Sequence, residues 1–186
     1  MGSMSSSSAI YEETKHAVFT SAAVAMAAAI RGRMECGTAL RPINGISHNL
    51  WGPQAGNVKT LNAKYTLAGL ALNTGACWFW AWLYRKGAHK VYSSTSGAAA
   101  GAVGVAVLAY VTDYHLIPRR FAPGFELSLS RHSFPWLYAA LAAGLFIPHL
   151  NNVEDHNLRA SADHPEYPVR AKKAEDKSNI ERNRTD

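Results

Sequence analysis

Four apolar segments, separated by polar and charged stretches, dominate the sequence. The longest uncharged one is Val91–Thr112, 22 residues between Lys90 and Asp113. As a helix, about 22 residues reach roughly 33 Å, enough to cross a bilayer core of about 30 Å. With their flanking residues, the four segments predict membrane spans at about 13–33, 65–84, 91–112 and 133–150. We therefore expect an all-α fold, a four-helix transmembrane bundle.

Two of the predicted spans carry small or polar residues at helical spacing. Gly97, Gly101 and Gly104 form one stripe, where missing side chains let another helix approach, within the chain or from another copy. In the span 65–84, Asn73 occupies the middle of the segment. Its face of the helix also holds Thr66, Gly69, Cys77 and Trp80. Because an amide facing lipid would lack hydrogen-bond partners, we expect Asn73 to face the bundle interior and contribute to helix packing.

The connections between the spans contain a predicted helix and a predicted irregular loop. Residues 39–52, ALRPINGISHNLWG, suit a short amphipathic helix that starts at Pro42 and stops at Gly52. Its apolar stripe comprises Leu40, Ile43, Ile46, Ser47 and Leu50, whereas Arg41, Asn44, His48 and Asn49 lie off the stripe. We expect this helix to lie on the membrane surface or to cover one end of the bundle. Pro118, Pro123 and Gly124 predict an irregular loop between residues 114 and 131.

Charge is concentrated outside the predicted spans. Eight of the 13 acidic residues and seven of the 19 basic ones follow Asn152, so residues 151–186 are expected to form a polar, disordered tail. Residues 1–9 begin MGSMSSSS, which resembles an expression remnant ahead of a native Met4. Net positive charge on the loops favours anionic lipid headgroups as a partner. Nucleic acid is not indicated, because no binding module is recognisable, and the basic residues do not decide the orientation.

The sharpest candidates for chemistry are three residues beside the span ends. Asp113 and His115 follow the third span, and Pro118 allows the helix to end there so that both side chains converge. His48, on the loop helix, would approach from the side. Two imidazoles and a carboxylate suit a divalent metal or a proton relay. The alternative is that Asp113 and His115 cap the helix and pair with Arg119 or Arg120.

Two other cofactor hypotheses are weaker. Glu13 and His16 have the spacing of a di-iron bundle, but a second copy of that spacing is missing, so a solvated first turn is favoured. For haem, the histidines lie too close to the span ends to serve as buried axial ligands. Two cysteines, Cys36 and Cys77, predict neither a disulfide nor a metal site.

Two segments resemble small bacterial inner-membrane proteins that have no assigned activity. They are RPINGISHNLWG, residues 41–52, and DYHLIPRRFAPGFE, residues 113–126. The similarity extends from about Lys15 to Leu150 and leaves out both ends of the chain. It implies a multi-pass protein of the bacterial inner membrane and carries over no catalytic residue.

These patterns favour a small polytopic membrane protein without enzymatic activity. It would be an accessory or self-associating component, with the lipid bilayer as one partner and a homo-oligomer or a larger membrane complex as another. The first alternative is a metal-dependent membrane enzyme or metal handler that uses His48, Asp113 and His115, with a divalent metal as its cofactor. The second alternative is a small transporter, which is less favoured because Asn73 is the main mid-span polar group and the spans contain no visible break.

Overall fold

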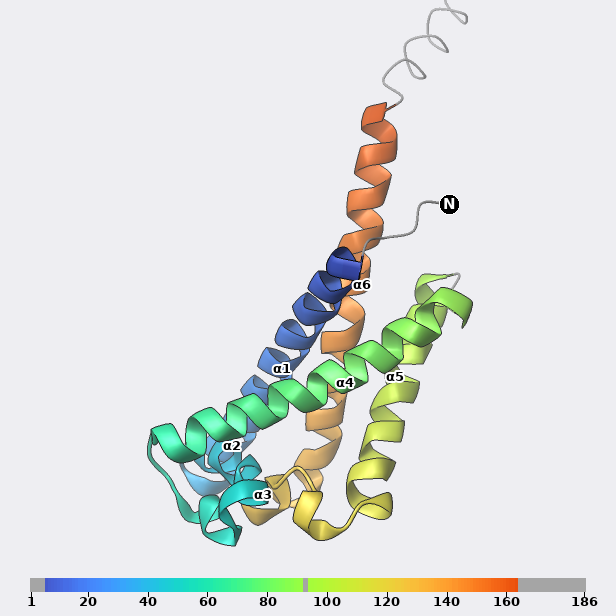
Figure 1. The fold of residues 1–186 in the computed structure, drawn as a ribbon. Helices are drawn as coiled ribbons and strands as arrows, with labels where there is room; N and C mark the ends of the chain where they lie inside the picture. Colours follow the sequence, from blue (N-terminus) through green and yellow to red (C-terminus); the bar gives the residue numbers. More distant parts are fainter. Residues whose placement is uncertain (1–5, 92–93, 164–186) are drawn as a thin grey trace, which may run out of the picture. The chain divides into compact units, whose positions relative to one another are not determined.

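The computed structural model describes residues 6–91 and 94–163, which form helices joined by turns and short loops, without strands in these ranges (Figure 1). The expected all-α class is therefore confirmed for the described part of the chain. The α-helices are α1 (Ser6–Cys36), α2 (Leu40–Ile46), α3 (His48–Trp51), α4 (Ala68–Val91), α5 (Thr95–Val111) and α6 (Phe134–Asp163). Two π-helical turns flank them, η2 (Ala63–Leu67) before α4 and η3 (Thr112–Leu116) after α5. The 3₁₀ turns are η1 (Pro53–Asn57), η4 (Arg119–Phe121), η5 (Phe125–Leu127) and η6 (Arg131–Ser133).

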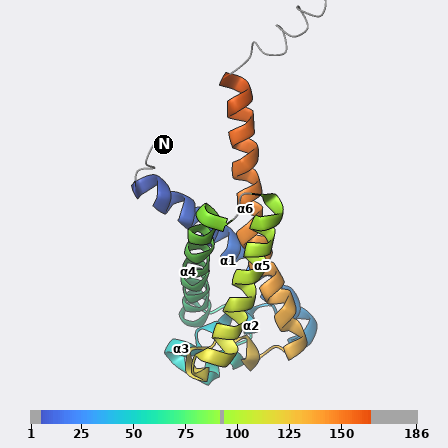
Figure 2. The same ribbon diagram turned by 90° about the vertical axis from the view of Figure 1, so that its right-hand side faces the viewer.

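The chain forms two compact units, residues 1–149 and 150–186. In the first unit, α1, α4, α5 and the beginning of α6 surround one apolar core (Figures 1 and 2). Helix α1 packs against α4, and α4 packs against α5. Helices α1 and α6 meet at Gly144, where a Cβ would lie 2.7 Å from the Cα of Thr20. Glycine at this crossing therefore lets the two backbones approach closely.

The inward face of α4 consists of the residues that recur at three- and four-residue steps. Thr66 of the preceding turn η2 and Gly69, Asn73, Cys77 and Trp80 of α4 are all buried. Asn73 Nδ2 donates to the carbonyl oxygen (3.0 Å) and the Oγ (2.8 Å) of Ser21 on α1. One turn beyond Trp80, the buried Tyr84 donates its hydroxyl to the Ala98 carbonyl oxygen of α5. The face therefore joins α4 to both neighbouring helices.

The buried face of α5 consists mainly of alanines, whereas Gly104 of the predicted glycine stripe is exposed. The buried residues of this helix are Ala98, Ala102, Val105, Ala106 and Ala109. Most of them follow a stripe one residue, or about 100°, around the helix from Gly97, Gly101 and Gly104. A Cβ on Gly104 would meet nothing within 4 Å. Gly104 therefore makes no close contact within the chain, and packing of the glycine stripe against another copy stays a prediction.

The segments at one end of the helices form a compact cap, which we define as residues 37–67 and 117–133. It contains α2, α3 and the short turns, and it lies at the lower end of the molecule in Figures 1 and 2. Helices α2 and α3 are not amphipathic in the predicted sense, since Asn44 and His48 are buried and Leu50 is 56% exposed. Backbone carbonyl oxygens of neighbouring cap segments accept hydrogen bonds from these polar side chains, and these bonds compensate for the loss of water.

The helix ends differ from the predicted span ends. Helix α4 continues to Val91, and α5 begins only at Thr95, where Ser94 Oγ accepts a hydrogen bond from Gly97 N (3.1 Å) as an N-cap. Helix α6 passes through Pro148 to Asp163, beyond the predicted end at residue 150. Helix α1 begins at Ser6, inside the predicted N-terminal segment, and residues 1–5 and 164–186 of the two predicted tails lie outside the described residues.

The described helices support only part of the four-span prediction. Within residues 6–91 and 94–163, a single helix, Thr95–Leu116, which joins α5 and η3, is long and apolar enough to cross a membrane. Helix α4 contains three tryptophans and a tyrosine between residues 78 and 84, and these lower the mean hydropathy although they favour the membrane interface. The four-span bundle stays a prediction.

Candidate functional site

The two segments that carry the resemblance pack directly against each other in the cap. Gly45 of α2 lies against Gly124, and a Cβ on Gly45 would come within 2.9 Å of the Gly124 carbonyl oxygen. Gly124 itself has φ of 85°, a left-handed conformation that favours glycine. His48 Nδ1 lies 3.1 Å from the Gly45 carbonyl oxygen, and Nε2 lies 3.5 Å from that of Arg119. These contacts fix the loop after α5 onto α2 and α3.

Asn44 holds the other side of the cap together. Its side chain is fully buried, and Nδ2 donates to the carbonyl oxygens of Val58 (2.9 Å) and Thr60 (3.0 Å). Its Oδ1 accepts a hydrogen bond from Thr66 Oγ1 (2.6 Å). Asn62 then caps the beginning of α4 by accepting from the backbone N of Lys64 (3.0 Å). The extended segment before α4 is thereby tied to α2.

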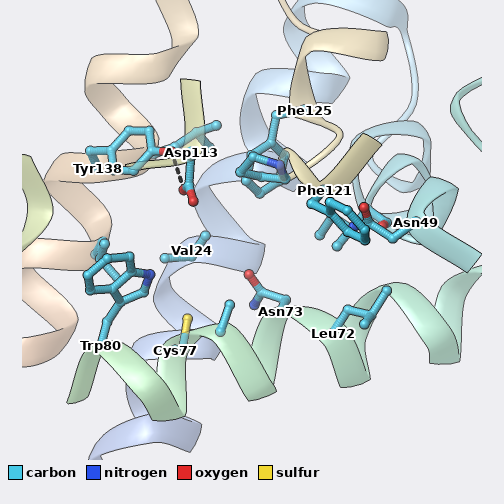
Figure 3. Close-up of a pocket in the computed structure, with 15 residues that line it drawn as sticks. Val24, Asn49, Leu72, Asn73, Cys77, Trp80, Asp113, Phe121, Phe125 and Tyr138 are labelled. Carbon is cyan, nitrogen blue, oxygen red and sulfur yellow. Dashed lines mark hydrogen bonds between the residues drawn. The ribbon is translucent and has the colours of Figure 1, made fainter. Parts of the chain in front are cut away.

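A cavity of about 230 Å³ lies between the cap and the helices (Figure 3). Its walls come from α1, α4, α6, η3 and the two resembling segments of the cap. The lining is mainly apolar and aromatic: Val24, Ile46, Leu72, Ala76, Trp80, Phe121, Pro123, Phe125, Leu137 and Leu141, with Asn49, Asn73, Cys77, Asp113 and Tyr138 as polar members. A pocket of this kind, apolar with a few converging polar groups, is typical of a small-molecule site.

Two polar groups in the cavity are held in fixed orientations. Asp113 Oδ2 accepts a hydrogen bond from the Tyr138 hydroxyl of α6 (2.7 Å), and its carboxylate points into the cavity (Figure 3). Because Asn73 Nδ2 donates to Ser21, its Oδ1 is left to face the cavity (Figure 3). The π-helical turn η3 assists this arrangement, since it continues the helix through Asp113 before Pro118 ends it.

Comparison with known proteins gives no assignment at this point. No protein family, no curated protein and no solved structure matches the chain. The resemblance to bacterial inner-membrane proteins therefore stays a prediction, and the residues of the cavity have to be interpreted from their own geometry.

The structure does not bring the three predicted metal ligands together. Asp113 lines the cavity, whereas the exposed His115 does not line it and packs its ring against Tyr110. His48 is held between the carbonyls of the cap. Within the described residues, no three His, Cys, Asp or Glu side chains form a metal-binding group. The helix continues through residue 115, which keeps residues two positions apart on different faces. The metal hypothesis therefore stays a prediction that this arrangement does not support.

The di-iron alternative likewise gains no support from the described residues, although for a different reason. His16 is not in a solvated first turn, since α1 begins ten residues earlier and the His16 side chain is only 2% exposed. Glu13 lies near it on the partly exposed surface of α1. No cluster of carboxylates and histidines forms around this pair within the described part of the chain.

Several cavity residues could not be recognised from the sequence. Tyr138 lies 25 residues after Asp113 and is joined to it only by the packing of α6. Phe121 and Phe125 belong to cap segments without a simple periodicity, and the pattern of residues 39–52 assigned Asn49 to the outside. Trp80 was recognisable, because it lies seven residues, or about two helical turns, after Asn73 on the same face of α4.

A surface network joins the end of α1 to the beginning of α6. Glu35 accepts hydrogen bonds from Arg31 Nη2 (2.6 Å), from Ser130 N (2.6 Å) and from Ser133 Oγ. Arg31 Nε also donates to Ser133 Oγ (2.6 Å). Desolvation raises the pKa of the Glu35 carboxyl, but the hydrogen bonds from Ser133, Ser130 and Arg31 outweigh it and lower the pKa to about 2.

This network predicts an acid-sensitive contribution to stability. Since the pKa of Glu35 falls from 4.5 to about 2 on folding, its stabilisation is fully present above pH 4.5 and is lost as the pH drops toward 2. At neutral pH, Glu35→Gln should destabilise the protein by about 1 kcal/mol, a small value because the group is largely exposed to solvent. Thermal unfolding of both proteins between pH 7 and 2.5 measures the difference, which should shrink below pH 4.5. A difference that is constant over this range would contradict the prediction.

Proposed function

We propose that this chain is a multi-pass, non-enzymatic accessory protein of the bacterial inner membrane, with α1, α4, α5 and the first half of α6 in lipid. The observation that carries the proposal is the distribution of polarity across the helices. Polar side chains such as Thr20, Ser21 and Asn73 are buried between them. Between the charged ends of the same helices, the large exposed side chains are apolar, including Val18, Phe19, Met26, Ile30, Trp78, Phe79, Val103, Val107, Leu108, Trp136 and Ile147. A water-soluble helical protein has the opposite distribution.

The ends of the helices agree with this placement. Between Lys15 and Arg31, and again between Phe134 and Ile147, the sequence contains no Asp, Glu, Lys or Arg. The cap, by contrast, carries exposed basic side chains, Lys59, Lys64, Arg119, Arg120 and Arg131. Lys64 Nζ lies 4.7 Å from the ring centroid of the half-exposed Trp51. Basic and tryptophan side chains together suit the headgroup layer of an anionic membrane.

A binding role is favoured over catalysis by the chemistry of the cavity. Its one thiol, Cys77, would need a basic neighbour to become a nucleophile. None of the fifteen described residues that line the cavity is His, Lys or Arg. The cavity carboxylate of Asp113 is hydrogen-bonded to a tyrosine hydroxyl. The arrangement therefore suits recognition of a small molecule.

Membrane integration is tested by fractionation of cells that express the chain. After alkaline carbonate washing, the protein should stay in the membrane pellet and should dissolve only in detergent. A peripheral protein with the same basic cap would be released by carbonate. Recovery of a monodisperse protein from the detergent-free supernatant would overturn the proposal.

The two free cysteines provide a second test. Cys36 is half-buried in the cap region, where Sγ lies 3.5 Å from the Ser128 carbonyl oxygen, whereas Cys77 is buried between the helices. In membrane vesicles, Cys77→Ala should be labelled at Cys36 by a membrane-impermeant maleimide from one side of the bilayer. Cys36→Ser should be labelled at Cys77 only after denaturation. Rapid labelling of Cys77 in intact vesicles would contradict the interior position of this face.

A further inference from the structure

The cavity contains a carboxylate without a complementary cation in its walls. Asp113 accepts one hydrogen bond, from Tyr138, whereas an ionised carboxylate offers about four acceptor positions. The fifteen described lining residues include no basic side chain. Removing a carboxylate from water is unfavourable unless a cation or several donors compensate it. The cavity therefore lacks a positive charge that a ligand would supply.

Two amide groups add further acceptors. Asn73 is oriented by Ser21, so its Oδ1 is left to face the cavity that Asp113 also lines (Figure 3). Asn49 donates its Nδ2 to the carbonyl oxygens of Ile46 (3.3 Å) and Ala122 (3.5 Å). Its Oδ1 is buried and has no hydrogen-bond partner among the described residues. The polar side of the cavity is thus composed chiefly of hydrogen-bond acceptors. It therefore favours a ligand that donates hydrogen bonds.

The walls restrict the ligand further. Trp80, Phe121, Phe125 and Tyr138 line the cavity, and aromatic faces attract organic cations. A single carboxylate and two amides provide too few oxygen ligands for Ca²⁺ or Mg²⁺. A volume of 230 Å³ exceeds the roughly 150 Å³ cavity that holds benzene, so a ligand of about ten non-hydrogen atoms fits.

We propose that this cavity binds a small organic ammonium ion with an apolar body. The ammonium group donates to the Asp113 carboxylate and the Asn73 carbonyl oxygen, and the apolar body lies among the aromatic side chains of the cap. This ligand site does not depend on the proposed membrane role. The cavity is formed by contacts within one chain, and these contacts are the same whether lipid or water surrounds the helices.

The test is isothermal titration calorimetry of the full chain in detergent micelles, with protein-free micelles as the blank. The probe is benzylammonium chloride, and benzyl alcohol is its uncharged analogue. The wild type should bind benzylammonium, and Asp113→Asn should weaken the affinity at least about tenfold, equivalent to about 1.4 kcal/mol. Ala76→Trp, which fills the cavity without altering Asp113, should weaken it as strongly.

The matched control is Glu126→Gln. It removes a negative charge from a nearby carboxylate that accepts from the Tyr114 hydroxyl (3.4 Å) and does not line the cavity. This variant should bind benzylammonium with an affinity within about twofold of the wild type. Size-exclusion elution of each variant checks that it is folded, and if Asp113→Asn aggregates, Ala76→Trp decides alone.

Three outcomes would overturn the site: no binding by the wild type, undiminished binding by a folded cavity variant, or equal binding of benzyl alcohol. Carbonate extraction of the membranes from which the protein is purified separates this result from the membrane proposal. A protein that stays in the membrane and does not bind benzylammonium overturns the ligand site alone. A protein that carbonate releases and that still binds overturns the membrane proposal alone.

Discussion

Gly69→Ala is expected to lower the apparent Tm of the detergent-solubilised protein by roughly 6–12 °C. Gly69 is the second residue of α4 and lies where this helix contacts the cap. A Cβ there would overlap the Ile43 carbonyl oxygen of α2. Backbone atoms cannot move aside as a flexible side chain does, so α2 and α4 must separate. Overpacking of this kind costs about 3 kcal/mol, and each 1 kcal/mol lowers the Tm by about 2–4 °C in a protein of this size.

Gly75→Ala is the matched control on the same helix. A Cβ on Gly75 would meet nothing within 4 Å, and alanine is favoured over glycine in a helix interior by about 0.5–1 kcal/mol. This variant should therefore keep or raise the Tm, by up to about 4 °C. Scanning calorimetry or a thiol-reactive dye assay measures both proteins under the same detergent conditions. Equal Tm values for the two variants would show that α2 does not pack on α4 as described.

The second large effect is expected at Asn44 in the cap. Asn44→Leu keeps the approximate size but leaves the carbonyls of Val58 and Thr60 and the hydroxyl of Thr66 without their partner. Each buried group that loses its hydrogen bond costs about 1–3 kcal/mol. A total of about 4 kcal/mol would lower the Tm by roughly 8–16 °C, with the loss of the ordered segment before α4.

Two further variants make the Asn44 result specific. Asn44→Asp has nearly the same shape but cannot donate to the two carbonyls, so it should be about as destabilising as Asn44→Leu. Asn57→Leu introduces the same change at an exposed position of η1 and should alter the Tm by less than about 2 °C. Limited proteolysis of the cap gives an independent measurement, because cleavage near residues 58–62 should accelerate only in the Asn44 variants. Equal stability of Asn44→Asp and the wild type would disprove the donor role.

These two sites agree in assigning the cap a structural function. Gly69 admits the backbone of α2, and Asn44 holds the segment before α4, so both act on the same corner of the first unit. The cap also supplies Ile46, Asn49, Phe121, Pro123 and Phe125 to the cavity. We therefore expect variants that loosen the cap to weaken benzylammonium binding as well.

The sequence by itself determined the helical class and the inward face of α4. Long uncharged segments favour helices in which every backbone polar group is paired internally. The three- and four-residue steps from Thr66 to Trp80 place one face toward the neighbouring helices, because this period matches the α-helix. The irregular loop after residue 116 followed from Pro118, Pro123 and Gly124, whose backbone restrictions act locally. Such features depend on residues close in the sequence.

Only the tertiary structure decided which faces and side chains meet. The glycine stripe of α5 and its alanine stripe are both small enough for packing, and the position of α4 selected the alanines. The hydrophobic pattern of residues 40–50 assigned His48 and Asn44 to the outside, but carbonyls of segments distant in the sequence satisfy them inside the cap. Asp113 was recognisable as a candidate, whereas its partner Tyr138 depends on the packing of α6 beside η3. Long-range contacts of this kind have no local sequence signal, because each helix offers several suitable faces and the assembled core selects among them.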